Sequence, residues 1–159
     1  SWFGDIFLLG QQYHTLFFIA GLASFLISHL MYAAYFYKSA LNSLNTNNWV
    51  KVIQLLLFIL VIGFYSLMYP GLAELKIPVL FYVSTIGLMG ILAVNRYQFV
   101  NSKSFYFTLI GAFAFILSDS LIGYSKFVSD IPYAHVLIMT FYCIAQYLIL
   151  RGFVAQETE

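Results

Sequence analysis

Long apolar segments, separated by short polar ones, make up almost the whole chain. Because most positions are apolar, the helical and strand periodicities do not discriminate, and the length of each apolar segment is the informative signal. A helix needs about 20 mainly apolar residues to cross a bilayer. Segments of roughly this length cover residues 15–37, 50–70, 78–95, 104–124 and 133–151. The pattern therefore predicts five membrane-spanning α-helices.

The connections between these segments fit the same interpretation. An asparagine-rich stretch follows the first span, and Pro70, Pro78 and Pro132 all lie at span ends, where a missing backbone N–H costs least. A membrane β-barrel would need strands of about ten residues that alternate apolar and polar positions, which these uniform runs lack. We expect an all-α, polytopic transmembrane bundle that forms one domain over residues 1–159. A partial helix at 1–9, whose beginning we expect upstream, precedes the five full spans.

The composition indicates that this protein folds in a lipid bilayer rather than in water. The chain is 62% hydrophobic and only 8% charged, whereas soluble domains carry roughly 25% charged residues. A net charge of +1 gives no field for binding nucleic acid, so we expect none as a partner. The single cysteine, Cys143, excludes an intrachain disulfide and a cysteine metal cluster. No zinc-binding spacing is present either, so we expect no zinc site.

Basic residues are distributed unequally between the two sides of the predicted bundle. Lys76 and Lys126 fall on one side. Five fall in the alternate connections and the tail, namely Lys38, Lys51, Arg96, Lys103 and Arg151. Cytoplasmic loops carry the excess of Lys and Arg, so we expect the C-terminus in the cytoplasm and interpret Arg96 and Lys103 as interfacial anchors. The expected location is a bacterial inner membrane.

Ionisable residues within spans are costly and usually mark functional sites. Asp119 lies within the fourth full span, and Asp5 lies near the end of the partial helix. The topology puts both carboxylates at a similar depth near the outer face. His29 lies in the middle of the first full span. Each also has a structural interpretation: Asp119 or His29 could hold helices together by hydrogen bonds, and Asp5 could be a solvated helix end.

Other polar side chains share faces with these candidates. Tyr32 lies three residues after His29, and Tyr142 and Gln146 lie four residues apart, so each pair shares a helix face. Ser118 directly precedes Asp119. Interhelical hydrogen bonding is the structural alternative for Tyr142 and Gln146.

Four segments, which form three matches, resemble the YhhN family of lysoplasmalogenase-like membrane proteins. Gly4–Leu9 (GDIFLL) with Phe18–Tyr32 (FIAGLASFLISHLMY) is similar to the first signature of the family. Gly111–Phe127 (GAFAFILSDSLIGYSKF) is similar to the second, and Tyr142–Ile149 (YCIAQYLI) is a weaker third match. Members of the family are usually longer, so we expect this stretch to lack their N-terminal helices.

The resemblance implies an activity. Characterised members hydrolyse the vinyl ether bond of lysoplasmalogens, which gives a fatty aldehyde and glycerophospho-ethanolamine or glycerophospho-choline. It therefore implies an ether-bond hydrolase whose substrate is a lysophospholipid taken from the lipid bilayer. The oligomeric state is not implied.

The chemistry of this reaction fits a pair of carboxylates. A vinyl ether is cleaved by protonation at its β-carbon, which gives a cation that water captures, so a general acid and an anionic group are needed. Asp119 is the more deeply placed, and an apolar site favours its protonated form, so we expect it to be the acid. Asp5 would stabilise the cation and orient the water, although the roles could be exchanged. The supporting residues would be His29, Tyr32, Ser118, Tyr142 and Gln146. Lys126 could meet the substrate phosphate. This mechanism requires no metal and no organic cofactor, so we expect none.

Two other function classes remain open. A small-molecule or proton-coupled transporter could use the same carboxylates as titratable groups, but transporters typically carry helices broken near the midplane, and the prolines here lie at span ends. A structural membrane subunit would not require two carboxylates at matched depth.

Overall fold

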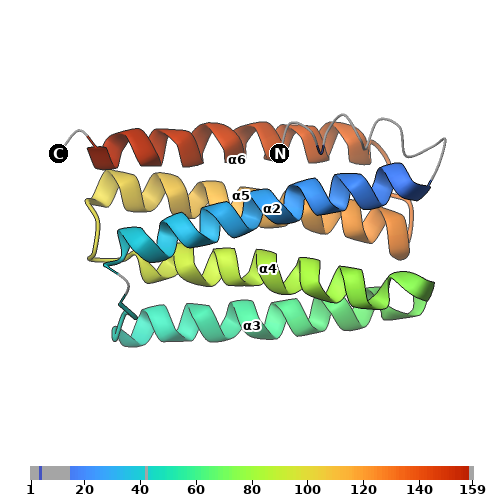
Figure 1. The fold of residues 1–159 in the computed structure, drawn as a ribbon, viewed down its shortest axis with the longest axis horizontal. Coiled ribbons are helices and arrows are strands. Elements are labelled where there is room, and N and C mark those ends of the chain that lie inside the picture. The colour runs from blue at the N-terminus through green and yellow to red at the C-terminus, as the bar shows by residue number, and fades with distance from the viewer. Residues whose placement is uncertain (1–3, 5–14, 42, 158–159) are drawn as a thin grey trace.

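A computed structural model describes residues 4, 15–41 and 43–157 of the chain. Within these residues it is an antiparallel bundle of long helices without strands (Figure 1). The long helices are α2 (Thr15–Ser39), α3 (Asn48–Met68), α4 (Lys76–Asn95), α5 (Ser102–Phe127) and α6 (Ala134–Glu157). Two short 3₁₀ helices, η1 (Tyr69–Gly71) and η2 (Ala73–Leu75), join α3 to α4. All five long helices are long and apolar enough to cross a membrane, which confirms the predicted fold class.

The helix ends differ in detail from the predicted spans. Asn101 starts α5 early because its side chain accepts a hydrogen bond from the backbone N–H of Ser104 at 2.7 Å, an N-cap that apolar patterning does not detect. Helix α6 ends at Glu157, six residues after the predicted end of its span at residue 151. Of the predicted partial helix at 1–9, only Gly4 is among the described residues.

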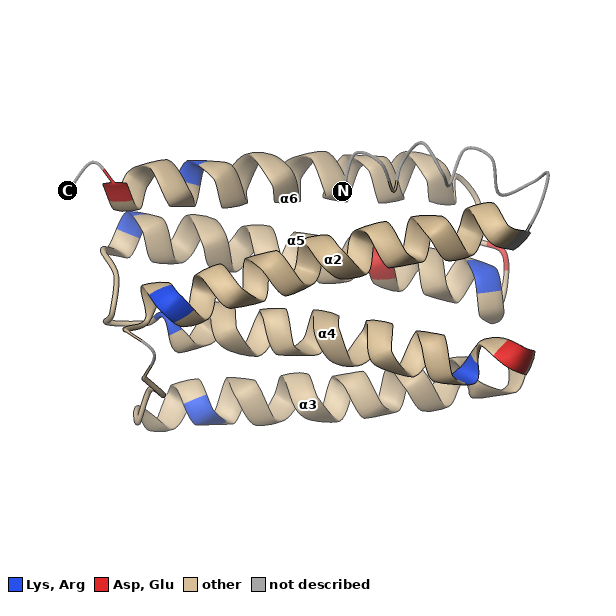
Figure 2. Cartoon of the chain, viewed as in Figure 1, with Lys and Arg blue, Asp and Glu red and all other residues tan. Residues whose placement is uncertain are grey.

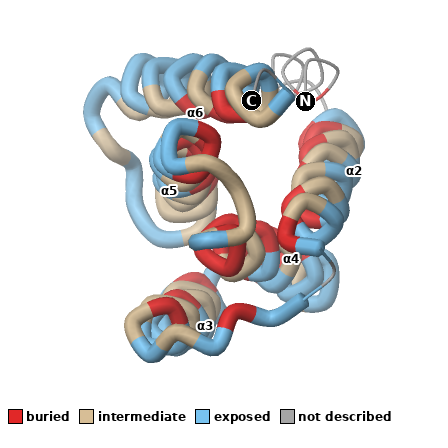
Figure 3. Tube along the Cα trace, turned by 90° about the vertical axis from the view of Figure 1, so that its left-hand side faces the viewer, coloured by how far each residue is buried: buried red, intermediate tan, exposed pale blue. Residues whose placement is uncertain are grey.

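Helix α4 lies at the centre of the bundle. It packs against α2, α3 and α5, and half of its most apolar segment (50%) is buried, compared with 11% for α3 (Figure 3). The outer face of α3 is therefore a row of exposed apolar side chains. In a bilayer such side chains contact lipid.

Helices α5 and α6 form the most extensive helix pair. Glycines allow their backbones to approach closely: a Cβ atom on Gly111 would lie 2.8 Å from Ile149 Cγ1, and one on Gly152 would collide with Thr108. Small residues serve the same purpose in many membrane helix interfaces. Helix α5 is thereby fixed between α4 on one side and α6 on the other.

Charged residues gather at the two ends of the bundle (Figure 2). We call the end where α2, α4 and α6 finish the basic end, because its helix ends and loops carry Lys38, Lys51, Lys103 and Arg151. The opposite end, where α3 and α5 finish, carries both acidic and basic residues, namely Glu74, Lys76, Lys126 and Asp130.

Arg96 lies at the basic end, but its interpretation as an interfacial anchor is wrong, because its side chain is fully buried. Its guanidinium donates hydrogen bonds to Ser39 at 2.7 Å, to Ser104 at 2.9 Å, to Gln156 at 2.7 Å and also to Thr108. These partners come from α2, α5 and α6, so Arg96 joins four helices. Burial lowers the pKa of Arg96 to about 10, which still leaves it charged at neutral pH.

Candidate active site

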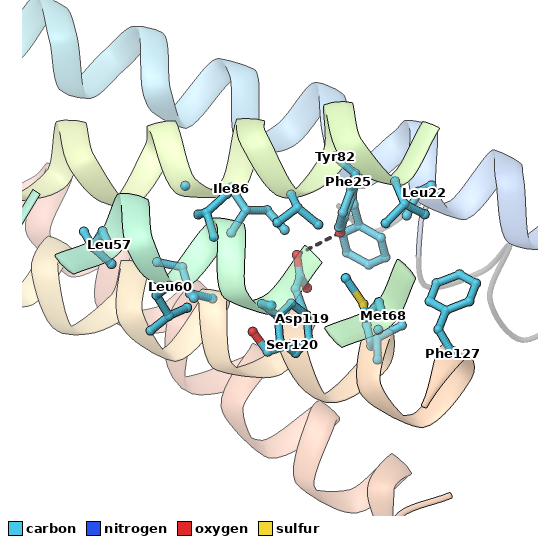
Figure 4. A pocket seen from close by; sticks show the side chains of 18 of the residues that line it. Leu22, Phe25, Leu57, Leu60, Met68, Tyr82, Ile86, Asp119, Ser120 and Phe127 are labelled. Carbon is cyan, nitrogen blue, oxygen red and sulfur yellow. Dashed lines mark hydrogen bonds between the residues drawn. The ribbon is translucent and has the colours of Figure 1, made fainter. Parts of the chain in front are cut away.

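The side chains of Asp119, Tyr82 and His29 meet in the interior of the bundle, and each comes from a different helix. The phenol of Tyr82, on α4, donates a hydrogen bond to Asp119 Oδ2 at 2.8 Å (Figure 4). His29 Nε2, on α2, lies 3.2 Å from the same oxygen. All three residues are buried. We call this group the Asp119 cluster.

The orientation of His29 determines how many protons the cluster holds. His29 Nδ1 lies 2.6 Å from the backbone carbonyl oxygen of Phe25. A carbonyl can only accept, so Nδ1 carries a proton and Nε2 of the neutral ring presents a lone pair. Nε2 and Asp119 Oδ2 therefore attract each other only when one further proton lies between them. The His29–Asp119 pair is therefore close enough to share a proton within the bundle.

Aromatic rings pack around His29 in this pair. The imidazole of His29 packs edge-on against Phe115, at 4.6 Å between ring centroids, and against Tyr82, at 5.8 Å. Such a low-dielectric environment strengthens the interactions among the polar groups inside it.

Asp119 borders an apolar pocket between α2, α3, α4 and α5. The pocket comprises about 770 Å³ of empty space, part of which is open to the surroundings. Its lining is apolar except for Tyr82, Asp119 and Ser120. Figure 4 shows Leu57 and Phe127 at the two ends of the pocket, with Asp119 between them. A ligand that fills this space must be mostly hydrocarbon, with its reactive part near Asp119.

The predicted supporting residues on α6 lie one layer away from Asp119. Tyr32 donates a hydrogen bond to Gln146 Oε1 at 2.8 Å, which ties α2 to α6. The ring of Tyr142 packs edge-on against Phe115, at 5.6 Å, and Phe115 in turn contacts His29. These side chains support the walls around the His29–Asp119 pair.

The remaining predicted residues have separate environments. Ser118 donates a hydrogen bond to the carbonyl of Ile138 at 3.0 Å and so links α5 to α6. Lys126 places its ammonium 5.1 Å from the centroid of the Phe18 ring, at the opposite end of the bundle. Asp5 lies outside the described residues, although Gly4 packs against the ring of Phe25.

Sequence reasoning missed Tyr82 and the carbonyl of Phe25. Tyr82 carried a weak signal, because it is an aromatic hydroxyl within an otherwise apolar span. Which helix faced Asp119 could not be read from one sequence. The carbonyl of Phe25 carries no side-chain signal at all.

Among the residues that the structure describes, no group of three or more His, Cys, Asp or Glu side chains could hold a metal ion.

Comparisons with known proteins identify the family. Two curated proteins named lysoplasmalogenase TMEM86A are similar to this chain: the one from Bos taurus is 34% identical over 151 residues and the one from Homo sapiens 33% identical over 150. Each alignment covers 92% of this chain and 58% of the relative, so the chain spans somewhat more than half of their length. No solved structure matches significantly. The sequence model of the YhhN family matches residues 1–153, and the chain belongs to this family.

Proposed function

We propose that this chain carries the active site of a membrane hydrolase that cleaves the vinyl ether bond of an alkenyl lysophospholipid. The observation that supports this most directly is the buried His29–Asp119 pair, whose nitrogen and oxygen lie 3.2 Å apart at the edge of an apolar pocket. We propose that this pair holds one proton. The names of the two relatives, lysoplasmalogenase, point to the same reaction.

The proposed reaction begins with protonation of carbon. The proton stored between Asp119 and His29 is transferred to the β-carbon of the vinyl ether, and the C=C electron pair forms the new C–H bond. The α-carbon becomes an oxocarbenium ion next to the ether oxygen. Water adds to this carbon and gives a hemiacetal, and the proton that the water loses restores the charge of the pair. The hemiacetal hydroxyl then loses its proton as the bond to the glycerol oxygen breaks, and the glycerol oxygen gains a proton, which yields a fatty aldehyde and a glycerophospho-alcohol.

Asp119 is the proposed general acid, and Tyr82 and His29 hold it in position. After it gives up the proton, the Asp119 carboxylate keeps the hydrogen bond from Tyr82, and its negative charge faces the developing cation. Hydrogen bonds to charged groups contribute about 1.5–3 kcal/mol each. Tyr82 is therefore a positioning residue that also favours the charge that Asp119 acquires.

Asp5 is the proposed second carboxylate, which stabilises the cation and orients the attacking water. Its sequence neighbour Gly4 packs on the ring of Phe25, whose carbonyl accepts the hydrogen bond from His29. Lys126 is the proposed partner of the substrate phosphate, from the end of the bundle where Asp119 lies closer to the surface.

The proposed orientation places the basic end in the cytoplasm, as the excess of Lys and Arg there favours. Asp119 lies eight residues before the end of α5, or about 12 Å along the axis from the opposite face, at a rise of 1.5 Å per residue. The reacting bond of a lysolipid lies just below its head group. The substrate would therefore come from the outer leaflet.

Aldehyde release from an alkenyl lysophospholipid, measured with the full-length protein in lipid nanodiscs, tests the proposal. In D₂O the aldehyde should carry one deuterium on the carbon next to the carbonyl, because that carbon receives the stored proton. Hydrolysis without this deuterium would refute carbon protonation as the mechanism. Folded protein that releases no aldehyde from any alkenyl lysolipid, whatever its head group, would refute the proposed function.

A further inference from the structure

The pocket beside Asp119 has the length of one lipid chain. On α3 its lining runs from Leu57 to Met68, a rise of about 16 Å at 1.5 Å per residue. The hydrocarbon core of a bilayer is about 30 Å thick and holds two leaflets, so one chain occupies about 15 Å.

Close contacts close the pocket at the opposite end of the bundle. The ring of Phe18 packs edge-on against Phe127, at 6.0 Å between centroids, and bridges α2 and α5. A Cβ atom on Gly71 would collide with the carbonyl oxygen of Phe127. A Cβ atom on Gly123 would lie 2.9 Å from Met68 Sδ, so α3 and α5 also meet there. The described residues thus form a roof over the pocket.

The pocket also ends on the side of the basic end. A Cβ atom on Gly90 would lie 2.8 Å from Ile116 Cδ1 and 3.5 Å from Leu57 Cδ1, so α3, α4 and α5 meet just below the lining. Beyond this contact the bundle is closed by Arg96 and its hydrogen-bond partners.

One lateral side of the pocket lies between α3 and α5. Leu60 lines the pocket, and yet 52% of its surface is exposed on the outside of α3. It is the one exposed side chain among the described lining residues. Ser120, next to Asp119, lines the pocket from α5 and is partly exposed (Figure 4). The outer surface at this depth is apolar helix that faces lipid, so this side of the pocket meets hydrocarbon rather than water.

We infer that the pocket binds a single hydrocarbon chain of a membrane lipid, which enters sideways from the bilayer between Leu60 and Ser120. Among the described lining residues only Tyr82, Asp119 and Ser120 are polar, and none is a cation that could pair with a phosphate, so the head group stays outside the bundle. The inference concerns binding and access, and it does not depend on the proposed reaction. In this arrangement the lipid chain passes between α3 and α5.

Photo-crosslinking tests this inference without turnover. The probe is a saturated alkyl lysophospholipid with a diazirine near the end of its chain, which has no vinyl ether to hydrolyse. With the full-length protein in nanodiscs, we expect crosslinks to concentrate on the pocket-lining parts of α3 and α5, at 57–64 and 116–123. Excess unlabelled saturated alkyl lysophospholipid should remove them.

A matched pair of variants tests the entrance. Leu60→Trp should block it and lower the competable crosslinks about tenfold, equivalent to about 1.4 kcal/mol of lost affinity. Leu56→Trp should leave them unchanged, because Leu56 is 58% exposed on the same helix but does not line the pocket. Ser120→Phe narrows the entrance from α5 and should act like Leu60→Trp. Circular dichroism checks the helix content of each variant.

Two results would overturn the inference: crosslinks spread evenly over the lipid-facing helices without competition, or crosslinks that both entrance variants leave unchanged. Aldehyde release is scored separately. Competable crosslinks without aldehyde release would contradict only the proposed reaction. Aldehyde release without competable crosslinks would contradict only the chain site.

Discussion

Replacing Asp119 with asparagine separates proton donation from packing. The two side chains have nearly the same size and shape, so the pocket keeps its volume. The amide N–H of asparagine can donate to the lone pair of His29 Nε2, just as a protonated carboxyl would. The variant therefore preserves the contact to His29 while removing the transferable proton.

The expected effects on activity and stability differ strongly in size. A positioned general acid typically contributes a factor of about 10² to 10⁴ to the rate. At 1.36 kcal/mol per factor of ten, Asp119→Asn should raise the barrier by about 3–5 kcal/mol. The contact to Tyr82 weakens in the variant, since its hydroxyl no longer meets a carboxylate, and the free energy of unfolding should fall by only about 1 kcal/mol.

The assay is aldehyde release in nanodiscs, together with thermal unfolding of the same preparations. Asp130→Asn is the matched control, because Asp130 is an exposed carboxylate in the loop after α5 at the same end of the bundle. It should leave both quantities unchanged. If Asp119→Asn retained more than about a tenth of the wild-type turnover while folded, Asp119 would not be the general acid.

Three further predictions concern single contacts. Tyr82→Phe removes a hydrogen bond to Asp119 and should lower kcat about 10- to 100-fold with KM unchanged, whereas Tyr65→Phe, which loses a bond only to a backbone carbonyl, should leave kcat as it is; equal effects would contradict the positioning role. Gly152→Ala should cost about 1–3 kcal/mol of unfolding free energy, because its Cβ atom collides with α5, and thermal unfolding should show no such loss for Gly63→Ala, where nothing lies within 4 Å. Arg96→Lys removes the planar guanidinium, whose N–H groups donate to several helices at once, and should lower the unfolding free energy by about 1.5–3 kcal/mol. An unchanged denaturation midpoint would show that the hydrogen bonds of Arg96 add little to stability.

The fold class could be predicted because the bilayer imposes one simple demand on the sequence. Every spanning helix must be a long apolar run, and five such runs are present in the chain. The same demand makes it hard to predict which side chains are buried, because a leucine that faces lipid and a leucine in the core look alike in the sequence. Leu57 and Leu60 are three residues apart on α3, and only the structure shows that one is buried and the other is half exposed.

The candidate site was predictable to the extent that charge is costly in a membrane. Asp119 and His29 stand out among apolar neighbours, and the structure places them 3.2 Å apart. Arg96 carried the same signal, but its position at a span end suggested an interfacial residue. Its burial depends on Ser39, Ser104 and Gln156, which come from three other helices and cannot be aligned by counting along the chain.

The roof formed by Phe18, Gly71 and Phe127 has a consequence for chemical access to Asp119. A carbodiimide that modifies carboxyl groups reaches them either from water or from lipid, according to its own solubility. With the aqueous end covered, a charged, water-soluble carbodiimide meets a barrier of aromatic rings, whereas a lipophilic one can partition into the bilayer and arrive from the side of α3. Compounds designed to inhibit such a site would gain more from membrane solubility than from mimicry of the polar head group.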